Sequence, residues 1–276
     1  MFYLINKRKG ITSFKATKEF SKENNIKKVG HTGTLDPLAT GLLLIAADDD
    51  TKLIEYIDKG SKSYIATMKI GYDSDTLDTD GKIVKVPGKF NGKSVTKAIN
   101  SFVKTYNQVP PNFSAKKING KRAYKLAREG LEVKLNSSSV TIKQIINIKK
   151  IDNETYQFEA EVSRGTYIRS LIRDIAESLG TKAIMSDLIR NKLAGFSIDN
   201  YPKQVSALEL IKINIIEIKD LTDLFQGKAV KVDSPDGRYA IKYKKDIIGI
   251  VDIENKIVSK RNLFGNKYKR VLNESN

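Results

Sequence analysis

One short loop carries most of the residues suited to chemistry. The segment 30–41 reads GHTGTLDPLATG and holds three glycines, the only histidine of the chain and a single carboxylate, Asp36. Glycine lets the backbone adopt positive φ and lets another molecule approach closely. The proline after Asp36 restricts that residue to extended or turn geometry. Because an Asp before Pro is most often a turn residue, Asp36 is either a turn former or a carboxylate presented for catalysis.

Composition excludes several other chemistries. The chain has no cysteine and one histidine, His31, and therefore no thiolate nucleophile and no zinc cluster of normal spacing. It contains neither a GxSxG nucleophile elbow nor a P-loop. What remains is a carboxylate with basic and aromatic helpers. Arg169, in SRGTYIRSL, is either such a helper, which would hold a neighbouring carboxylate ionised, or part of a solvated helix face.

An acidic run, DSDTLDTDG over 73–81, superficially resembles a calcium loop. It does not match the EF-hand pattern, because Leu77 occupies a ligand position and no glycine follows it. We interpret the run as a solvated or capping turn.

The charge of the chain points to a polyanionic partner. It has 49 Lys and Arg against 32 Asp and Glu, a formal net charge of +17. A nucleic acid partner explains this surplus, and a generally lysine-rich proteome is the alternative. The surplus is concentrated over 116–134 and 241–276, which favours patches. The absence of a signal sequence and of a long apolar run indicates a cytoplasmic protein.

Hydrophobic periodicity predicts the elements that position these residues. We expect a helix capped by Ser13 and running to about Asn24, and further helical segments over 51–59, from Ser94, over 121–129 and over 167–179. Strands are expected over 42–47, 63–72, 140–151 and 156–162, with short strands over 229–232, 239–243, 247–252 and 256–259. Regular βαβ alternation is missing, so the pattern favours an α+β fold. We place a domain boundary after residue 226, with a small β module over 227–276.

Five segments in a fixed order resemble the bacterial tRNA pseudouridine synthases of the T-arm type, the TruB family. The resemblance covers roughly residues 3–225, about four-fifths of the chain. The five segments read GHTGTLDPLATG (30–41), KSYIATMKIGYDSDTLDTDG (62–81), PPNFSAKKINGKRAYKLAREG (110–130), SRGTYIRSL (163–171) and LIRNKLAGF (188–196). Three departures are Arg8 in place of a usual proline, Asp48–Asp50 in place of a Gly-x-Ala stretch, and Ala194-Gly195 in place of Gly-Pro.

The resemblance implies a pseudouridine synthase fold, with a mixed, largely antiparallel central sheet flanked by helices. It implies an isomerase that converts the T-loop uridine of tRNA (conventional position 55) to pseudouridine without a cofactor or a metal. Asp36 would be the nucleophile, Tyr64 would stack on the base and help remove the C5 proton, and Arg169 would position Asp36. The implied substrate-binding residues are His31, which would help extrude the uridine, Leu188, Tyr167, Lys116, Lys117 and Lys121.

Alternatives remain open at this point. The chain could instead be the catalytic subunit of a guide-RNA-dependent pseudouridylation particle, a tRNA-folding chaperone, or a glycosidase with a second carboxylate near Asp36. We expect tRNA as the partner, through its T-arm, a monomeric enzyme and no required protein partner. The C-terminal module resembles a reduced PUA-like RNA-binding domain in size, position and strand content, and an unrelated role is the other reading.

Overall fold

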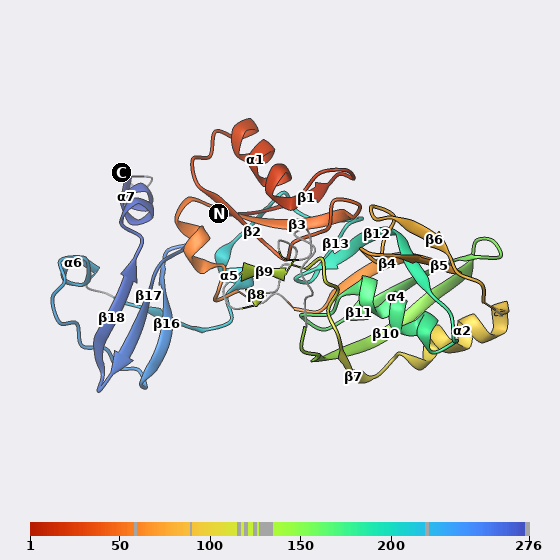
Figure 1. The fold of residues 1–276 in the computed structure, drawn as a ribbon. Helices are drawn as coiled ribbons and strands as arrows, with labels where there is room; N and C mark the ends of the chain where they lie inside the picture. Colours follow the sequence, from red (N-terminus) through yellow and green to blue (C-terminus); the bar gives the residue numbers. More distant parts are fainter. Residues whose placement is uncertain are drawn as a thin grey trace.

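A computed structural model describes residues 1–57, 60–88, 90–114, 117–118, 121–123, 126, 135–218 and 221–273, and for residues 117, 118, 121 and 122 it describes the backbone only. Two sheets organise this part of the chain (Figure 1). The larger, ten-stranded sheet follows the order β14-β1-β3-β12-β4-β11-β10-β7, with β2 paired to β3 and β13 paired to β12. Its strands are β1 (Phe2–Lys7), β2 (Val29–Thr32), β3 (Thr40–Ala47), β4 (Lys62–Ile70), β7 (Thr105–Gln108), β10 (Ser138–Lys150), β11 (Thr155–Val162), β12 (Ala183–Leu193), β13 (Phe196–Ser197) and β14 (Gln204–Val205).

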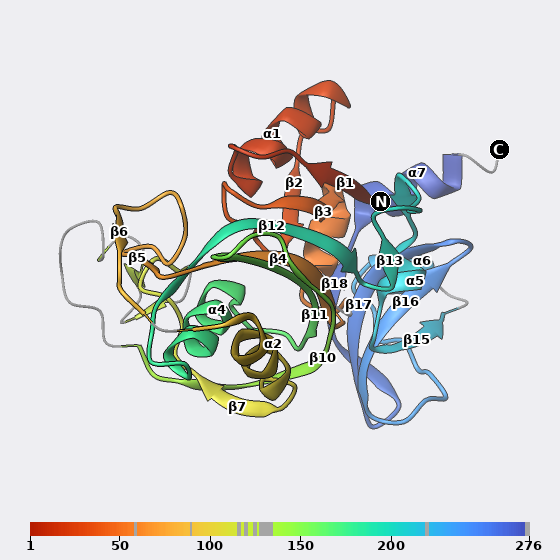
Figure 2. The ribbon, with the colours of Figure 1, turned by 90° about the vertical axis from the view of Figure 1, so that its right-hand side faces the viewer.

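The larger sheet is antiparallel except where β12 runs parallel to β3. It curls around α2 (Gly92–Ser101) and α4 (Ile168–Glu177), while α1 (Ser13–Glu23) lies over β1, β2 and β3 (Figure 2). The apolar stripe expected from Ile168 to Ile175 is buried against β4 and β11 in the main core. This confirms the predicted α+β class with a mixed, largely antiparallel sheet.

The strand after the Asp36 loop, β3, is buried on both faces. Successive side chains of a strand point to opposite faces. Accordingly Leu42 and Leu44 pack in a cluster with Ile250 of the second sheet, whereas Leu43 packs with Ala16 of α1. A continuous apolar run is therefore what this position requires.

The start of α1 differs from the prediction. Thr12, not Ser13, is the N-cap, and its hydroxyl accepts a hydrogen bond from the backbone N–H of Lys15 at 3.1 Å. Ser13 is buried inside the helix, where its Oγ donates to the carbonyl of Leu35 (3.1 Å) and accepts from the N–H of Leu35 (2.8 Å). Either hydroxyl can cap a helix, and the contact with a distant loop decides between them.

Three other predicted elements are wrong in part. A 3₁₀ helix, η1 (Asp48–Leu53), and a turn replace the start of the helix expected over 51–59. Lys121–Arg122 form a strand, β9, paired with β8 (Lys117–Ile118), instead of beginning a helix over 121–129, most of which lies outside the described residues. The segment 229–232 forms no full strand. It makes a single antiparallel β-bridge, between Lys231 and Ile257.

The second sheet forms the C-terminal module. Its order is β15-β16-β17-β18, and its elements are β15 (Asn214–Glu217), α6 (Leu221–Phe225), β16 (Gly237–Tyr243), β17 (Asp246–Glu254), β18 (Ile257–Leu263) and α7 (Gly265–Asn273). The boundary after residue 226 stays a prediction, although β15 and α6 precede it and pack in the core of this module.

A buried charge cluster joins the module to the larger sheet. Lys267 of α7 contacts Asp50 at 2.7 Å and Asp246 at 3.0 Å, and the side chains of Lys267 and Asp50 are 4% and 1% exposed. The N-terminal amino group of Met1 also pairs with Asp50. The Asp48–Asp50 departure thus supplies the carboxylate that holds α7 against the end of β3.

The remaining short elements are α5 (Ala207–Leu210) and the hairpin of β5 (Tyr72–Ser74) and β6 (Ile83–Lys85). Among the helices of the described residues, none has the length and apolar character needed to cross a membrane.

The backbone at Gly41, the end of the Asp36 loop, lies very close to the backbone of β12, and a substitution there tests this packing. Its φ is +106°, and an added Cβ would lie 2.4 Å from the carbonyl oxygen of Arg190. Gly180 also has positive φ, +68°, but an added Cβ there meets nothing within 4 Å. We expect Gly41→Ala to lower the free energy of unfolding by about 3 kcal/mol or more, from strain plus collision, and Gly180→Ala by about 1–2 kcal/mol, from strain alone. Urea denaturation measures both, and equal losses would contradict the close packing.

Candidate active site

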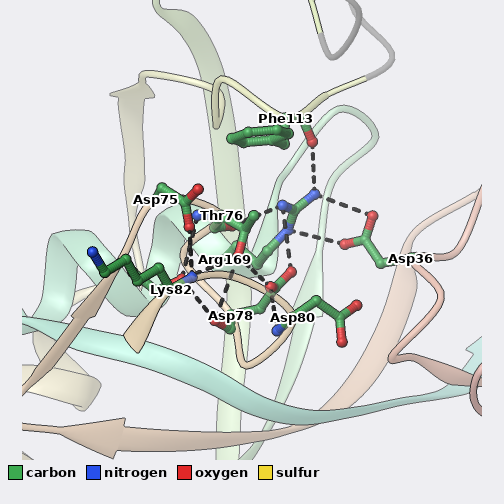
Figure 3. A network of polar contacts seen from close by, with 9 residues as sticks. Asp36, Asp75, Thr76, Asp78, Asp80, Lys82, Phe113 and Arg169 are labelled. Atoms are coloured by element: carbon green, nitrogen blue, oxygen red, sulfur yellow. Dashed lines mark hydrogen bonds and ion pairs between the residues drawn. The ribbon is translucent and has the colours of Figure 1, made fainter. Parts of the chain in front are cut away.

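Asp36 and Arg169 form a two-pronged ion pair. Arg169 lies on the first turn of α4, where its Nε is 3.0 Å from Asp36 Oδ2 and its Nη2 is 3.1 Å from Oδ1 (Figure 3). Two parallel contacts fix both the position and the plane of a carboxylate. The Arg169 side chain is 6% exposed and that of Asp36 35% exposed. The pair therefore presents its carboxylate, not its guanidinium, to the solvent.

The remaining donors of Arg169 are also engaged. Nη1 donates to the carbonyl of Thr76 at 2.9 Å, and Nη2 donates to the carbonyl of Phe113 at 3.0 Å. Nη1 also lies 3.5 Å from the Oδ2 of Asp78. Because three chain segments hold the guanidinium, Asp36 is paired with a fixed partner.

The acidic run 73–81 contributes to this network, which corrects its interpretation as a solvated turn. Asp78 is 4% exposed, and its Oδ1 accepts hydrogen bonds from Thr76 Oγ1 (2.5 Å) and from the N–H of Asp80 (3.0 Å). Other members do cap the turn, since Asp75 accepts from the N–H of Lys82. The run therefore folds back on itself and presents one buried carboxylate to Arg169 (Figure 3).

Opposing effects set the ionisation of Asp36. Burial raises the pKa of this carboxyl above its ordinary value, whereas the Arg169 guanidinium lowers the pKa, and the charges of Asp78 and Asp80 raise it again. A desolvated carboxylate is more basic than one in water, and the two-pronged pair favours its ionised form. The site thus combines a reactive carboxylate with a built-in counter-ion.

A buried lysine, Lys7, binds backbone carbonyls in and near the Asp36 loop. Lys7, at 1% exposure, donates from Nζ to the carbonyls of Ile11 (2.8 Å), Arg8 (3.0 Å) and Pro37 (3.4 Å). Burial lowers the pKa of Lys7 to about 8. Its position at the end of β1 carried no signal of this role in the sequence.

Arg190 of β12 clamps the two ends of the same loop. It is fully buried, with Nε donating to the carbonyl of Leu42 at 2.6 Å and Nη1 to the carbonyl of Gly33 at 2.8 Å. Its backbone pairs with Gly41. Sequence reasoning missed Arg190, although it lies within the LIRNKLAGF segment.

Apolar side chains lie beneath the loop. Tyr64 of β4 is 7% exposed and Leu188 of β12 is 5% exposed. Both belong to the cluster that contains Leu35 and Leu38, the residues on either side of Asp36 and Pro37. Tyr64 and Leu188 therefore belong to the same core cluster as the apolar residues that flank Asp36 and Pro37.

The other residues expected at the site lie around it. His31 of β2 is half-buried, with its ring nitrogens 3.3 Å from Thr17 Oγ1 and 3.4 Å from Thr34 Oγ1, and burial together with Arg190 lowers the pKa of its imidazole. Tyr167 precedes α4, and its backbone N–H donates to Gln108. Lys116 and the side chains of Lys117 and Lys121 lie outside the described residues.

Asp78 is not placed to act as the second acid of a two-carboxylate mechanism. Asp78 approaches the same guanidinium as Asp36, but its side chain is 5% exposed and hydrogen-bonded within its own turn. It is therefore placed to support Arg169 and not to protonate a substrate. Within the described residues, no group of three His, Cys, Asp or Glu side chains is placed to hold a metal ion.

Comparison with known proteins gives consistent matches. Residues 21–168 match the model of the TruB family pseudouridylate synthase N-terminal domain. The chain is 48% identical to the tRNA pseudouridine synthase B of Mycoplasmopsis pulmonis, over 99% of this chain and 98% of the relative. It is 39% identical to the protein of the same name from Mycoplasma mobile, with the same coverage. The structure is similar in fold to a chain in the crystal structure of a Cbf5-Nop10-Gar1 complex, with a TM-score of 0.62, 20% identity, and coverage of 95% of this chain and 83% of that one.

Substitution of Asp78 tests the charge network directly. Because the Asp78 charge raises the pKa of Asp36, we expect Asp78→Asn to lower the pKa of Asp36, measured by carbon-13 NMR titration of the carboxyl. Asp80→Asn is the matched control on the same turn, since Asp80 is exposed and acts on Asp36 more weakly. An unchanged or higher pKa of Asp36 in Asp78→Asn would show that the two carboxylates are not coupled.

Proposed function

Because the chain belongs to the TruB family of pseudouridylate synthases, we propose that it converts uridine to pseudouridine in tRNA, and that its target is the T-loop uridine. The observation that carries this proposal is the half-buried Asp36 carboxylate held by the buried guanidinium of Arg169. The reaction is an isomerisation. It breaks the bond between the ribose C1′ and N1 of uracil and forms a bond between C1′ and C5. C5 loses its proton to solvent, and N1 gains a proton.

Asp36 is the nucleophile in this scheme. Its ionised carboxylate forms a bond to the ribose C1′ or to the uracil ring, the C1′–N1 bond breaks and the uracil turns. C5 then bonds to C1′, and the bond to Asp36 breaks, which restores the free carboxylate. Arg169 holds the carboxylate in one plane during the attack, so that little reorganisation is needed. The raised basicity of a desolvated carboxylate suits this role.

Tyr64 and Leu188 form the apolar side of the pocket. A base removed from a folded RNA needs an aromatic or apolar surface to replace its stacking partners. Tyr64 supplies an aromatic ring next to the Asp36 loop and helps to remove the C5 proton in the last step. Leu188, close to it in the same cluster, completes the wall.

The remaining expected residues serve RNA binding. His31 lies on β2, at the entrance of the Asp36 loop, and helps to extrude the uridine from the T-loop. Tyr167 and the basic residues Lys116, Lys117 and Lys121 contact the RNA around it. The C-terminal module adds nine basic residues over 241–276 against four acidic ones, which suits a second RNA contact of the PUA type.

A guide-RNA-dependent particle is the second candidate function. The similarity in fold to Cbf5 is at 20% identity, and that protein is in a complex with Nop10 and Gar1. We prefer the stand-alone enzyme because the much closer relatives are named tRNA pseudouridine synthases. Action as a monomer, without a protein partner and in the cytoplasm, stays part of the proposal.

Incubation of the purified chain with unmodified tRNA tests the function. Carbodiimide modification followed by primer extension maps pseudouridine, and we expect a single stop in the T-loop. Asp36→Asn should abolish the stop, at least a 10³-fold loss of rate, because the amide is not a nucleophile of comparable strength. It should still bind tRNA, since it leaves the basic surface unchanged.

Asp199→Asn serves as a control, because it removes an exposed carboxylate elsewhere on the chain. A stop that persists in Asp36→Asn would disprove the catalytic assignment. A requirement for guide RNA would favour the second candidate, and unmodified tRNA after incubation with the wild-type chain would rule out the proposed activity.

A further inference from the structure

The most exposed large apolar side chain of the described residues lies beside the site. Phe14, on the first turn of α1, is 65% exposed, whereas Ala16 and Thr17 of the same helix are buried. Removing an aromatic ring from the core in this way sacrifices burial, which is favourable for such side chains. The ring of Phe14 is therefore accessible to a molecule outside the chain.

The backbone at Phe14 is connected to the Asp36 loop through Ser13. Its neighbour Ser13 is hydrogen-bonded to both backbone groups of Leu35, and Leu35 directly precedes Asp36. The loop before α1 is joined to the same site, because the N–H of Gly10 donates to the carbonyl of Pro37 at 2.9 Å. The start of α1 and the loop that carries Asp36 are thus joined by hydrogen bonds on both sides of Asp36.

The surroundings of Phe14 are cationic. The Lys18 Nζ lies 5.7 Å from the centroid of the Phe14 ring, and Lys15, Arg8 and Lys9 are exposed nearby in the chain. Arg8 pairs with Glu19 and Lys9 with Asp187, while no ion pair of Lys15 or Lys18 occurs among the contacts of the described residues. We call Arg8, Lys9, Phe14, Lys15 and Lys18 the α1 patch.

An exposed ring among cations suits a nucleotide better than a protein partner. Single-stranded or locally opened nucleic acid is bound by aromatic side chains that stack on bases and by Lys and Arg that neutralise phosphates. A protein interface would require a contiguous apolar area, but the residues around Phe14 are charged. Extrusion of a target uridine also removes a stacking partner from its neighbours, so that an unstacked base lies next to the target.

From these observations we infer that the α1 patch is an RNA-binding site in which the Phe14 ring stacks on a base of the tRNA next to the target uridine and Lys15 and Lys18 contact the flanking phosphates. This inference rests on the proposed function. It adds a binding site outside the pocket formed by Asp36, Tyr64 and Leu188. Its contribution is to affinity for the opened RNA, not to the chemical step.

The chain has no tryptophan, so Phe14→Trp introduces a unique fluorophore at the patch. Stacking of a base on the indole quenches its fluorescence, and we expect quenching on addition of unmodified tRNA. Ile151→Trp is the matched control, because Ile151 is 58% exposed and lies after β10, outside the α1 patch. Fluorescence of bound Phe14→Trp that is unchanged, or that changes no more than that of Ile151→Trp, would overturn the inference.

Binding measurements separate stacking from charge. Phe14→Ala should weaken tRNA binding about 10-fold, which corresponds to the usual contribution of one stacked base, with an unchanged slope of log affinity against log salt. Phe14→Tyr should restore it. Lys15→Gln with Lys18→Gln should instead make the slope shallower by about one for each lost phosphate contact.

The single-turnover rate at saturating tRNA should be the same in Phe14→Ala and the wild type. If Phe14→Ala binds tRNA as tightly as the wild type does, stacking on Phe14 is refuted. This holds whether or not the wild-type chain forms pseudouridine. If the wild-type chain forms no pseudouridine in tRNA, the proposed function is refuted. The α1 patch is tested separately, because quenching of Phe14→Trp by bound tRNA reports on the patch and not on the reaction.

Discussion

The contact between Asp36 and Arg169 is the interaction on which the site depends. A carboxylate at the edge of a protein core is desolvated, which disfavours its ionised form. A guanidinium held by two carbonyls and a second carboxylate offsets this cost and fixes the orientation of the group. Loss of Arg169 would leave the carboxylates of Asp36 and Asp78 without their shared counter-ion. The chemistry that we propose requires this pair to be both ionised and stationary.

Much of the larger sheet serves to hold the loop that carries Asp36. β12 meets the loop through its backbone at Gly41 and through the buried side chain of Arg190, which binds the carbonyls at both ends. Lys7 holds the carbonyl of Pro37, and Ser13 holds both backbone groups of Leu35. The loop thus has few conformations available even before substrate binds, which is the physical meaning of a preorganised site. The module at the far side of β3 adds support through Lys267 and Asp50.

Sequence patterns were sufficient for the elements whose burial follows a simple period. α1, β3, β4 and α4 lie close to the predicted ranges because each presents an apolar face to a neighbour. The residues that support the site were harder to find, because their roles depend on contacts over long sequence separations. Asp78 belongs to a run of acids in a turn, and only its contact with Arg169, 91 positions later, distinguishes it. Lys7 is the last residue of β1 and Arg190 lies within β12, and nothing local predicts that each binds backbone carbonyls of the same loop.

The most direct test of the central claim is the pH dependence of the single-turnover rate in the wild type and in Arg169→Gln. In the reaction that we propose Asp36 acts in its ionised form, so the rate is expected to fall as the pH falls through the pKa of that carboxyl. Arg169 lowers this pKa, and its removal should therefore move the acid limb to higher pH and also lower the rate on the plateau. An acid limb at the same pH in both proteins would show that Arg169 does not control the ionisation of the group that reacts, and would contradict the account.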